Sequence, residues 1–252
     1  MSRYFIELAY KGTKYSGFQI QENANTIQSE VEEAFQTIQR KPVKLTGSSR
    51  TDAGVHAIQN YFHFDFANEI HSQLVYKMNS ILSADIVIKH IYLMNSQAHS
   101  RFDAISREYD YKLHSLKNPF IQDVSFYFPY KLDKDLIFRA IEIIKMQDNF
   151  FGFAKSNSQV KNYKCKIEKC EWKEEGAEMI FTIKANRFLR GMVRLLTASV
   201  LKVGRGKMMI DEFEKLFDGI SKCVYSVPAH GLFLREVCFP ENYFPLTDMD
   251  LR

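Results

Sequence analysis

The sequence has no long run of apolar residues. Among its 252 residues, no segment approaches the roughly 18 consecutive apolar residues that a membrane-spanning helix needs. The first four residues lead directly into a strand-like alternation and not into the apolar stretch of a signal peptide. We therefore expect a cytoplasmic protein without a membrane partner.

Cysteine is also scarce, and the four cysteines lack the paired C-x-x-C spacing of a zinc site. A chain of this length without an export signal has little use for disulfides. His56 has no second histidine nearby, so a structural hydrogen bond is expected for it and not a metal. Reduced thiols with structural roles are expected at Cys165, Cys170, Cys223 and Cys238.

The charge of the chain is nearly balanced. Its net charge of +4 permits a polyanionic partner without demanding one. Hydrophobic residues make up 46% of the sequence, which is enough for one large domain or for two small ones that share a core.

Hydrophobic periodicity predicts four strands and two helices in the first half. Apolar residues at 27, 31, 34, 35 and 38 mark one helical face, with Asn25 or Thr26 as the N-cap and Pro42 as the stop. Three phenylalanines alternate with polar residues between 62 and 66, in the two-residue period of a half-buried strand. The predicted strands are 4–10, 43–45, 62–66 and 86–93, and the helices begin at 27 and 70.

The second half repeats this order of elements. Its predicted strands are 107–113, 165–173, 178–185 and 232–239, and its helices are 136–145 and 187–202. Two consecutive β-α-β-β-α-β units predict an α+β protein with mainly antiparallel sheets, helices on one face, and a cleft where the halves meet. The predicted halves are 1–104 and 105–252.

A polar, glycine-flanked segment lies between two predicted strands, at residues 46–57. It holds Arg50 and Asp52 two positions apart. In an arbitrary loop such an aspartate most often accepts hydrogen bonds from nearby backbone N–H groups. Taken alone, the segment leaves open whether Asp52 is structural or catalytic.

The segment Arg50-Thr51-Asp52-Ala53-Gly54-Val55-His56-Ala57 resembles the R-T-D-A-G-V-H-A signature of the TruA family of tRNA pseudouridine synthases. Eight consecutive residues agree, which is a specific signal. The similarity continues in family order across nearly the whole chain, over residues 8–19, the strand with Tyr109 and Tyr111, 188–194 and 229–232.

This resemblance implies the pseudouridine synthase fold, in which two ferredoxin-like or RRM-like halves flank a central positively charged cleft. It implies isomerisation of uridine to pseudouridine at positions 38, 39 and 40 in the anticodon arm of tRNA. It also implies a homodimer, with neither a metal nor an organic cofactor.

The resemblance implies roles for single residues. Asp52 would be the nucleophilic carboxylate, Arg194 would pair with it across the cleft, and Arg50 and Tyr109 would complete the catalytic set. A carboxylate in a cleft drifts toward its neutral form unless a cation such as Arg194 lies close. Removing one partner of a buried ion pair of this kind lowers stability by about 3–5 kcal/mol, because the remaining charge is left unpaired. The expected substrate-binding residues are Tyr109, Arg187, Arg190, Leu232, Lys11, Lys14 and Arg107.

The reaction requires an extruded base, because the reacting atoms C1′, N1 and C5 are enclosed while the base is stacked. An aromatic platform such as Tyr109 contributes about 1–3 kcal/mol per stacked base, although a strand tyrosine is ordinarily a core residue. Arg187, Arg190 and Arg194 stand at i, i+3 and i+7 and are expected to share one helix face. Further phosphate contacts are expected from Arg40, Lys41, Lys44, Arg101, Lys202, Arg205 and Lys207.

Two positions depart from the family pattern. Ser49 stands where glycine is common and could narrow the backbone approach to the target nucleotide. Phe18 stands where tryptophan is common and keeps an apolar ring without the N–H donor. Neither change removes a reactive group.

Two alternatives remain open at this point. A catalytically silent RNA-binding protein could keep the scaffold, because a positive groove and aromatic platforms suffice for binding. A nucleoside or glycoside hydrolase could use Asp52 and release free uracil. The sequence shows no dependable second carboxylate to serve that hydrolase as the general acid.

Overall fold

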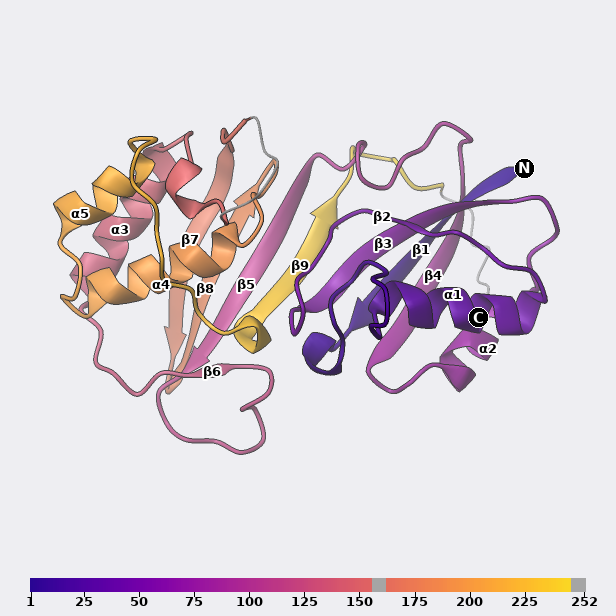
Figure 1. Ribbon diagram of the computed structural model, residues 1–252, viewed down its shortest axis with the longest axis horizontal. Helices are drawn as coiled ribbons and strands as arrows, with labels where there is room; N and C mark the ends of the chain where they lie inside the picture. Colours follow the sequence, from indigo (N-terminus) through magenta and orange to yellow (C-terminus); the bar gives the residue numbers. More distant parts are fainter. Residues whose placement is uncertain (156–161, 246–252) are drawn as a thin grey trace. The chain divides into compact units, whose positions relative to one another are not determined.

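The computed structural model describes residues 1–155 and 162–245, and its contacts divide the chain into two compact units (Figure 1). The first unit contains Met1–Ile105 together with the described residues from Leu234 on, and the second contains Ser106–Phe233. The sequence-based division instead places all residues after 104 in the second half. The elements of the first 105 residues are β1 (Ser2–Tyr10), the 3-10 helix η1 (Gly12–Lys14), α1 (Ile27–Gln39), β2 (Thr46–Gly47), β3 (His56–Phe66), α2 (Leu74–Ile81) and β4 (Ile86–Met94).

The strands of the first unit run in the order β4-β1-β3-β9, where β9 is Leu232–Cys238. β1 is antiparallel to both β3 and β4, and the short β2 pairs antiparallel with β3. The Val237 N–H on β9 donates to the Gln59 side chain of β3 at 3.1 Å. The predicted β-α-β-β-α-β order of this half is therefore confirmed.

Helix α1 begins where the sequence predicts. Thr26 is the N-cap, and it exchanges hydrogen bonds with Ser29 in a capping box, so two backbone N–H groups at the helix start are satisfied. The helix ends at Gln39, because Arg40 adopts a left-handed conformation with φ 57°. The chain thus leaves the helix before it reaches Pro42.

The predicted strand at 43–45 is wrong, since only Thr46 and Gly47 pair with β3. Helix α1 explains the difference. The Gln28 amide donates to the Leu45 carbonyl, and the Glu32 carboxylate accepts from the Leu45 N–H, both at 2.8 Å. Both backbone groups of Leu45 are occupied by helix side chains and cannot enter a strand ladder.

Strand β3 is buried on both faces, and not on one as the alternation suggested. On one face, Phe64 and Phe66 meet the ring of Phe35 in α1 at 5.1 and 5.2 Å. On the other, Tyr61 and His63 are only 3% and 6% exposed. This second face lies under what we call the C-terminal aromatic cover, a set of rings near Tyr61 and the neighbouring Phe5 that comprises Phe239, Tyr243 and Phe244.

The second unit has the order β-α-β-β-α with additions, and the strand predicted to complete it, 232–239, lies mainly in the first unit as β9. Its strands run β5-β8-β7 and are antiparallel, while β6 pairs parallel with β5. Helix α3 packs on β7 and on α4. The elements are β5 (Ser106–His114), β6 (Phe126–Tyr127), α3 (Lys134–Met146), η2 (Phe151–Phe153), β7 (Ile167–Glu175), β8 (Glu178–Ala185), α4 (Met192–Gly204), α5 (Ile210–Glu214), η3 (Lys215–Phe217) and η4 (Ala229–Gly231).

Helix α4 begins five residues later than the sequence pattern predicts. Gly191 precedes it in a left-handed conformation with φ 74°, which no helix interior allows. The carbonyl of Arg190 accepts from the Lys155 N–H at 3.0 Å and is therefore tied to another segment. Arg187 and Arg190 lie before the helix, so the predicted single face of three arginines is wrong.

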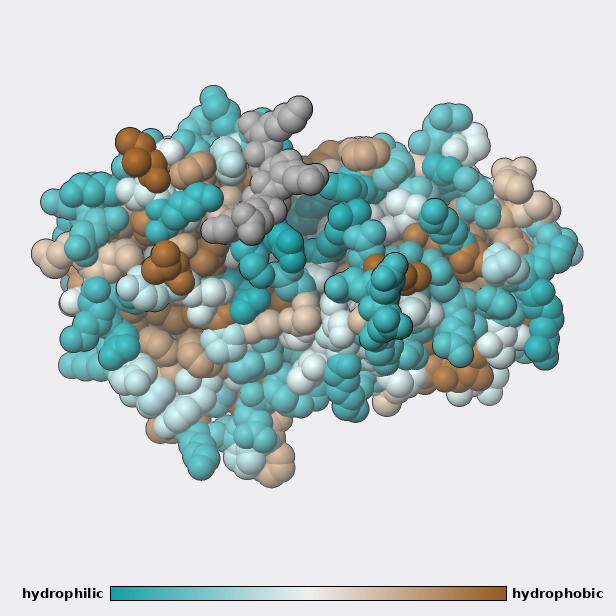
Figure 2. Space-filling model, in the orientation of Figure 1, coloured by the Kyte–Doolittle hydropathy of each residue, from teal (hydrophilic) through white to brown (hydrophobic). Residues whose placement is uncertain are grey.

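The cysteines are free thiols, as predicted. Burial raises the pKa of Cys165 to about 11, which leaves it protonated and unreactive at neutral pH. Among the described residues, no helix is long and apolar enough to cross a membrane. The face shown in Figure 2 is mostly hydrophilic, with hydrophobic residues in small groups.

Candidate active site

Asp52 lies on the loop 48–55, which joins β2 to β3 in the first unit. Its side chain is partly exposed. Its carbonyl accepts from the Val55 N–H at 3.1 Å, and Gly54 takes the left-handed conformation with φ 78° that closes the turn. The backbone of Asp52 therefore takes part in closing the turn.

Two glycines after β1 form the backing of this loop. The Phe18 N–H donates to the Thr51 carbonyl at 3.1 Å, and a Cβ on Gly17 would lie 3.1 Å from that same oxygen. A Cβ on Gly12 would lie 1.9 Å from the carbonyl oxygen of Val55. Only glycine permits this approach at position 12, so the segment after β1 fixes the position of the loop.

His56 has the structural role predicted for it. Its side chain is 1% exposed, and Nδ1 accepts from the Gly12 N–H at 3.1 Å. A nitrogen that accepts this bond carries no proton, so the proton of the neutral ring is on Nε2. His56 therefore fastens the end of the Asp52 loop to the segment after β1.

The basic residues predicted around this loop differ in their surroundings. Arg50 is exposed and Lys11 is half-buried. Lys14 forms an ion pair with Asp85 at 2.9 Å, and that bond raises the pKa of Lys14. Because Asp85 offsets its charge, Lys14 is a weaker candidate for a phosphate contact than Arg50.

The second unit places Tyr109 and Arg194 on regular elements. Tyr109 lies on β5 opposite Ile183, is 9% exposed, and meets the ring of Phe188 edge-on at 5.0 Å. Arg194 is in the first turn of α4, and its Nε donates to the Val227 carbonyl at 2.8 Å. That bond fixes the plane of the guanidinium group through one of its five N–H donors.

The remaining predicted residues lie on loops or at the start of a strand. Arg187 and Arg190 are exposed, on the segment between β8 and α4. Arg107 on β5 donates to the Asn186 carbonyl at 3.4 Å, which ties it to the same segment. Leu232 is buried at the first position of β9.

A sequence model of the tRNA pseudouridine synthase family matches residues 8–100 and 148–240, which include most of the elements that carry these side chains. The chain belongs to this family. The match covers the Asp52 loop in the first unit and Arg194 in the second, whereas the stretch with Tyr109 lies between the two matched ranges.

Three relatives that align with nearly the whole chain are named tRNA pseudouridine synthase A. The chain is 40% identical to the one from Parabacteroides distasonis, over 98% of this chain and 100% of the relative. It is 39% identical to the one from Porphyromonas gingivalis, over 97% and 100%. It is 34% identical to one from Staphylococcus aureus, over 95% and 92%.

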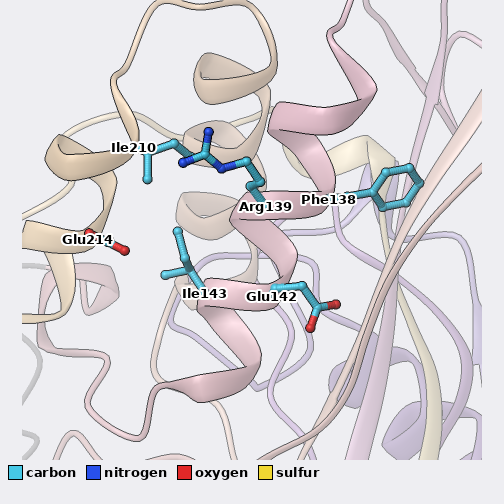
Figure 3. Close-up of a pocket in the computed structure, with 6 residues that line it drawn as sticks. All are labelled: Phe138, Arg139, Glu142, Ile143, Ile210 and Glu214. Carbon is cyan, nitrogen blue, oxygen red and sulfur yellow. The ribbon is translucent and has the colours of Figure 1, made fainter.

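A pocket of about 390 Å³ lies between α3 and α5, in the second unit (Figure 3). Arg139 and Glu214 point into it from facing helices. None of the residues predicted for the reaction lines this pocket. It is bordered by Phe138, Arg139, Glu142, Ile143, Ile210 and Glu214.

Some contributors to the Asp52 loop were not predicted from the sequence. Gly12 and Gly17 belong to the stretch that resembles the family, yet no role was assigned to them. Tyr10 and Asn60 also reach the loop, and both are almost fully buried. Glycines in the segment that follows a strand are a usable signal for close backbone approach, whereas Asn60 in mid-strand gives none.

Proposed function

We propose that this protein converts uridine to pseudouridine in tRNA, and that Asp52 is the carboxylate that carries the reaction. The observation behind this is the loop itself. Membership of the tRNA pseudouridine synthase family comes with the complete eight-residue motif around Asp52, in a turn that is closed by a backbone hydrogen bond and a left-handed glycine. The three relatives named tRNA pseudouridine synthase A align over nearly their full length.

The reaction breaks the N1–C1′ bond and forms a C5–C1′ bond in the same nucleotide. The carboxylate attacks C1′, or stabilises the cationic sugar, while the uracil leaves as an anion. The base rotates and C5 bonds to C1′, which releases the carboxylate where it had bonded to that carbon. The hydrogen on C5 then departs to water, and N1 takes up a proton. Atoms balance without any co-reactant, as an isomerisation requires.

Arg194 and Tyr109 are the second unit's proposed contributions. A guanidinium group is always charged and would hold Asp52 in the ionised form that attack requires. The Nε bond to Val227 supports this role, because it orients Arg194 in advance. Tyr109 would stack on the flipped uracil, and Arg50 would contact the adjacent phosphate.

The proposed tRNA contacts are electrostatic and aromatic. Arg187, Arg190, Lys11 and Arg107 would bind phosphates and set the position of the tRNA on the protein. Cations near the carboxyl end of α4 support an RNA surface, since Lys202 lies 2.7 Å from the ring centre of Tyr225 and Arg205 lies 3.7 Å from that of Tyr130. Cations fixed at one surface in this way are suited to contact phosphates.

The finer part of the proposal concerns the target positions in tRNA, the oligomeric state and the cellular location. We propose uridines 38, 39 and 40 of the anticodon arm as the targets and a homodimer as the active form, both from the family resemblance. Since tRNA is the substrate, we place the enzyme in the cytoplasm.

The test uses an unmodified tRNA transcript with tritium at uracil C5 in the anticodon arm. C5 loses its hydrogen only when it becomes the new glycosidic carbon, so release of tritium to water measures the reaction. Asp52→Asn should abolish release while tRNA binding persists. Asp65→Asn is the matched control, because Asp65 lies in the same unit in an exposed pair with Arg3 and should leave the rate unchanged.

Each alternative predicts its own outcome. A silent RNA-binding protein binds the transcript tightly and releases no tritium, with or without Asp52. A hydrolase yields free uracil. Either result would overturn the proposed function.

A further inference from the structure

A buried chain of hydrogen bonds connects the strands of the first unit to the Asp52 loop. The Tyr10 hydroxyl at the end of β1 lies 2.8 Å from Thr51 Oγ1. Asn60 on β3 donates from Nδ2 to Tyr10 Oη at 3.2 Å and to the Ser49 carbonyl at 2.8 Å. The chain therefore reaches the residue immediately before Asp52 and the residue immediately before Arg50.

The surroundings fix the orientation of these groups. The Tyr61 N–H donates to Asn60 Oδ1 at 2.9 Å, and the reversed amide would set Oδ1 against the Ser49 carbonyl. Nδ2 therefore faces both acceptors. Tyr10 Oη accepts from Asn60 and shares a second hydrogen bond with Thr51 Oγ1, in which either oxygen can be the donor.

Packing alone does not explain these polar groups. Asn60 is 0% exposed and Tyr10 is 4% exposed, within a core where Phe18 stacks on Phe62 at 4.4 Å. A phenylalanine at position 10 would fill the same space without a hydroxyl. Burying a polar side chain is costly unless it is hydrogen-bonded, and here the bonds lead to the reactive loop.

The strands that carry the chain are firmly placed. Asn60 pairs with Leu8 in the ladder of β1 and β3, and Tyr10 pairs with Ala57. The side chain of Thr51 is held by Tyr10 and its carbonyl by the Phe18 N–H. Thr51 therefore determines the direction in which the Asp52 side chain points.

We propose that Tyr10 and Asn60 are positioning residues that fix Thr51 and Ser49 and thereby aim the Asp52 carboxylate at the sugar. Neither residue touches substrate. This role rests on the proposed function, because aim matters only if Asp52 reacts. A displacement of 1 Å at a reacting group can lower a rate by roughly 100-fold, so even a small loss of order should be measurable.

The test compares three variants in single-turnover tritium release, with enzyme in excess over tRNA. Tyr10→Phe and Thr51→Val each remove one end of the 2.8 Å bond. We expect each to slow release on the order of 10-fold, with the tRNA dissociation constant within about twofold of wild type. The double variant should be no slower than either single one, since both remove the same bond.

Two controls separate positioning from general stability. Tyr15→Phe removes a matched bond, because the Tyr15 hydroxyl lies 2.8 Å from Ser83 Oγ and the side chain is 6% exposed. It should lower stability, as Tyr10→Phe does, and keep a rate within about twofold of wild type. Thr51→Ser keeps the hydroxyl and should restore most of the rate that Thr51→Val loses.

The outcomes are distinguishable. A wild-type rate in Tyr10→Phe, or losses that multiply in the double variant, would overturn the positioning role while leaving the enzyme active. Absence of release in the wild type would instead overturn the proposed function. If Tyr10→Phe does not fold, Thr51→Val against Thr51→Ser decides, and equal rates in those two would reject the role.

Discussion

The two units share the element order β-α-β-β-α but hold their functional side chains by different means. In the first, Asp52 lies on a loop that is held by hydrogen bonds and by close contact with Gly12 and Gly17. In the second, Tyr109 and Arg194 lie on a strand and a helix. A loop permits a carboxylate to project from the sheet, and regular elements supply rigid platforms for a ring and a cation.

The second helix of each unit shows the difference most clearly. Helix α2 has 8 residues, and its Tyr76 is 65% exposed. Helix α4 has 13 residues, nearly all buried, because it packs against α3 and α5 and the Cys223 thiol lies against its Ser199. Helix α4 is thus a core helix whose position is set by packing, whereas α2 covers one face of its sheet.

The largest expected effect tests the packing of α4. Leu196→Ala should lower the free energy of unfolding by about 2–5 kcal/mol, because Leu196 is 0% exposed and its loss leaves a cavity. Tyr76→Ala on α2 should change it by less than about 0.5 kcal/mol. Urea denaturation measures both, and similar losses in the two variants would remove the distinction between the helices.

A smaller effect tests how the first unit holds its loop. Gly12→Ala should cost about 1–3 kcal/mol of stability, because its Cβ would meet the Val55 carbonyl and displace the loop. Tritium release should fall with it. Gly176→Ala is the matched change in the second unit, where a Cβ meets nothing within 4 Å although φ is +59°. That variant should lose about 1–2 kcal/mol through backbone strain and keep its activity.

Buried histidine–serine pairs occur in both units, and their pH dependence is the next test. His63 lies 2.8 Å from Ser100 Oγ, and His114 lies 2.9 Å from Ser125 Oγ. Burial, with the positive charges of His99 and Arg3, lowers the pKa of His63 from 6.5 to about 4. Burial also lowers the pKa of His114.

Since a lowered pKa means that the unfolded chain takes up the proton first, His63 stabilises the fold fully above pH 6.5. This contribution is lost as the pH falls toward about 4. The free energy of unfolding of His63→Gln, measured by urea denaturation between pH 7 and 4.5, should fall less steeply with decreasing pH than that of the wild type. The difference in slope should be up to about 1.4 kcal/mol per pH unit. His114→Gln should shift in the same direction. An unchanged slope in both would contradict the buried, neutral state of these rings.

The smallest expected effect concerns Arg187 and Arg190, which lie on the loop before α4 in the second unit. Arg187→Gln and Arg190→Gln should each reduce the slope of log affinity for tRNA against log salt by about 1, because each removes one phosphate contact. Single-turnover rates at saturating enzyme should stay close to wild type. Lys145→Gln is the control, since Lys145 already pairs with Glu142 at 2.7 Å and should leave the slope unchanged.

Local patterns were enough to predict much of the fold. The capping residue Thr26, the alternation in β1 and β4, and the hairpin of β7 and β8 depend on neighbours within a few residues. The role of His56 as a hydrogen-bonding residue could also be predicted, because nothing nearby in the sequence could complete a metal site. The Asp52 loop was located by its motif, which is a local feature.

The misplaced strand at 43–45, the late start of α4 and the buried second face of β3 involve partners that are distant in sequence. The backbone of Leu45 is kept out of the sheet by hydrogen bonds to the side chains of Glu32 and Gln28, which are 13 and 17 residues away. The start of α4 depends on the bond between Lys155 and Arg190. On the second face of β3, His63 contacts Ser100 after β4, and Tyr61 contacts the C-terminal aromatic cover. Periodicity carries no information on such pairs.

The last strand has a consequence for the order in which the chain is made. The first 105 residues include three long strands of the first unit, but β9 and the C-terminal aromatic cover come from beyond Leu232. During synthesis at about 5–20 residues per second, the edge of β3 and the rings of Phe5 and Tyr61 stay uncovered until residues 232–244 emerge. An open edge beside exposed aromatic rings is prone to pair with other chains. The nascent first unit is therefore the stage at which a chaperone would be of most use, and a ribosome stalled before Leu232 would release an aggregating fragment.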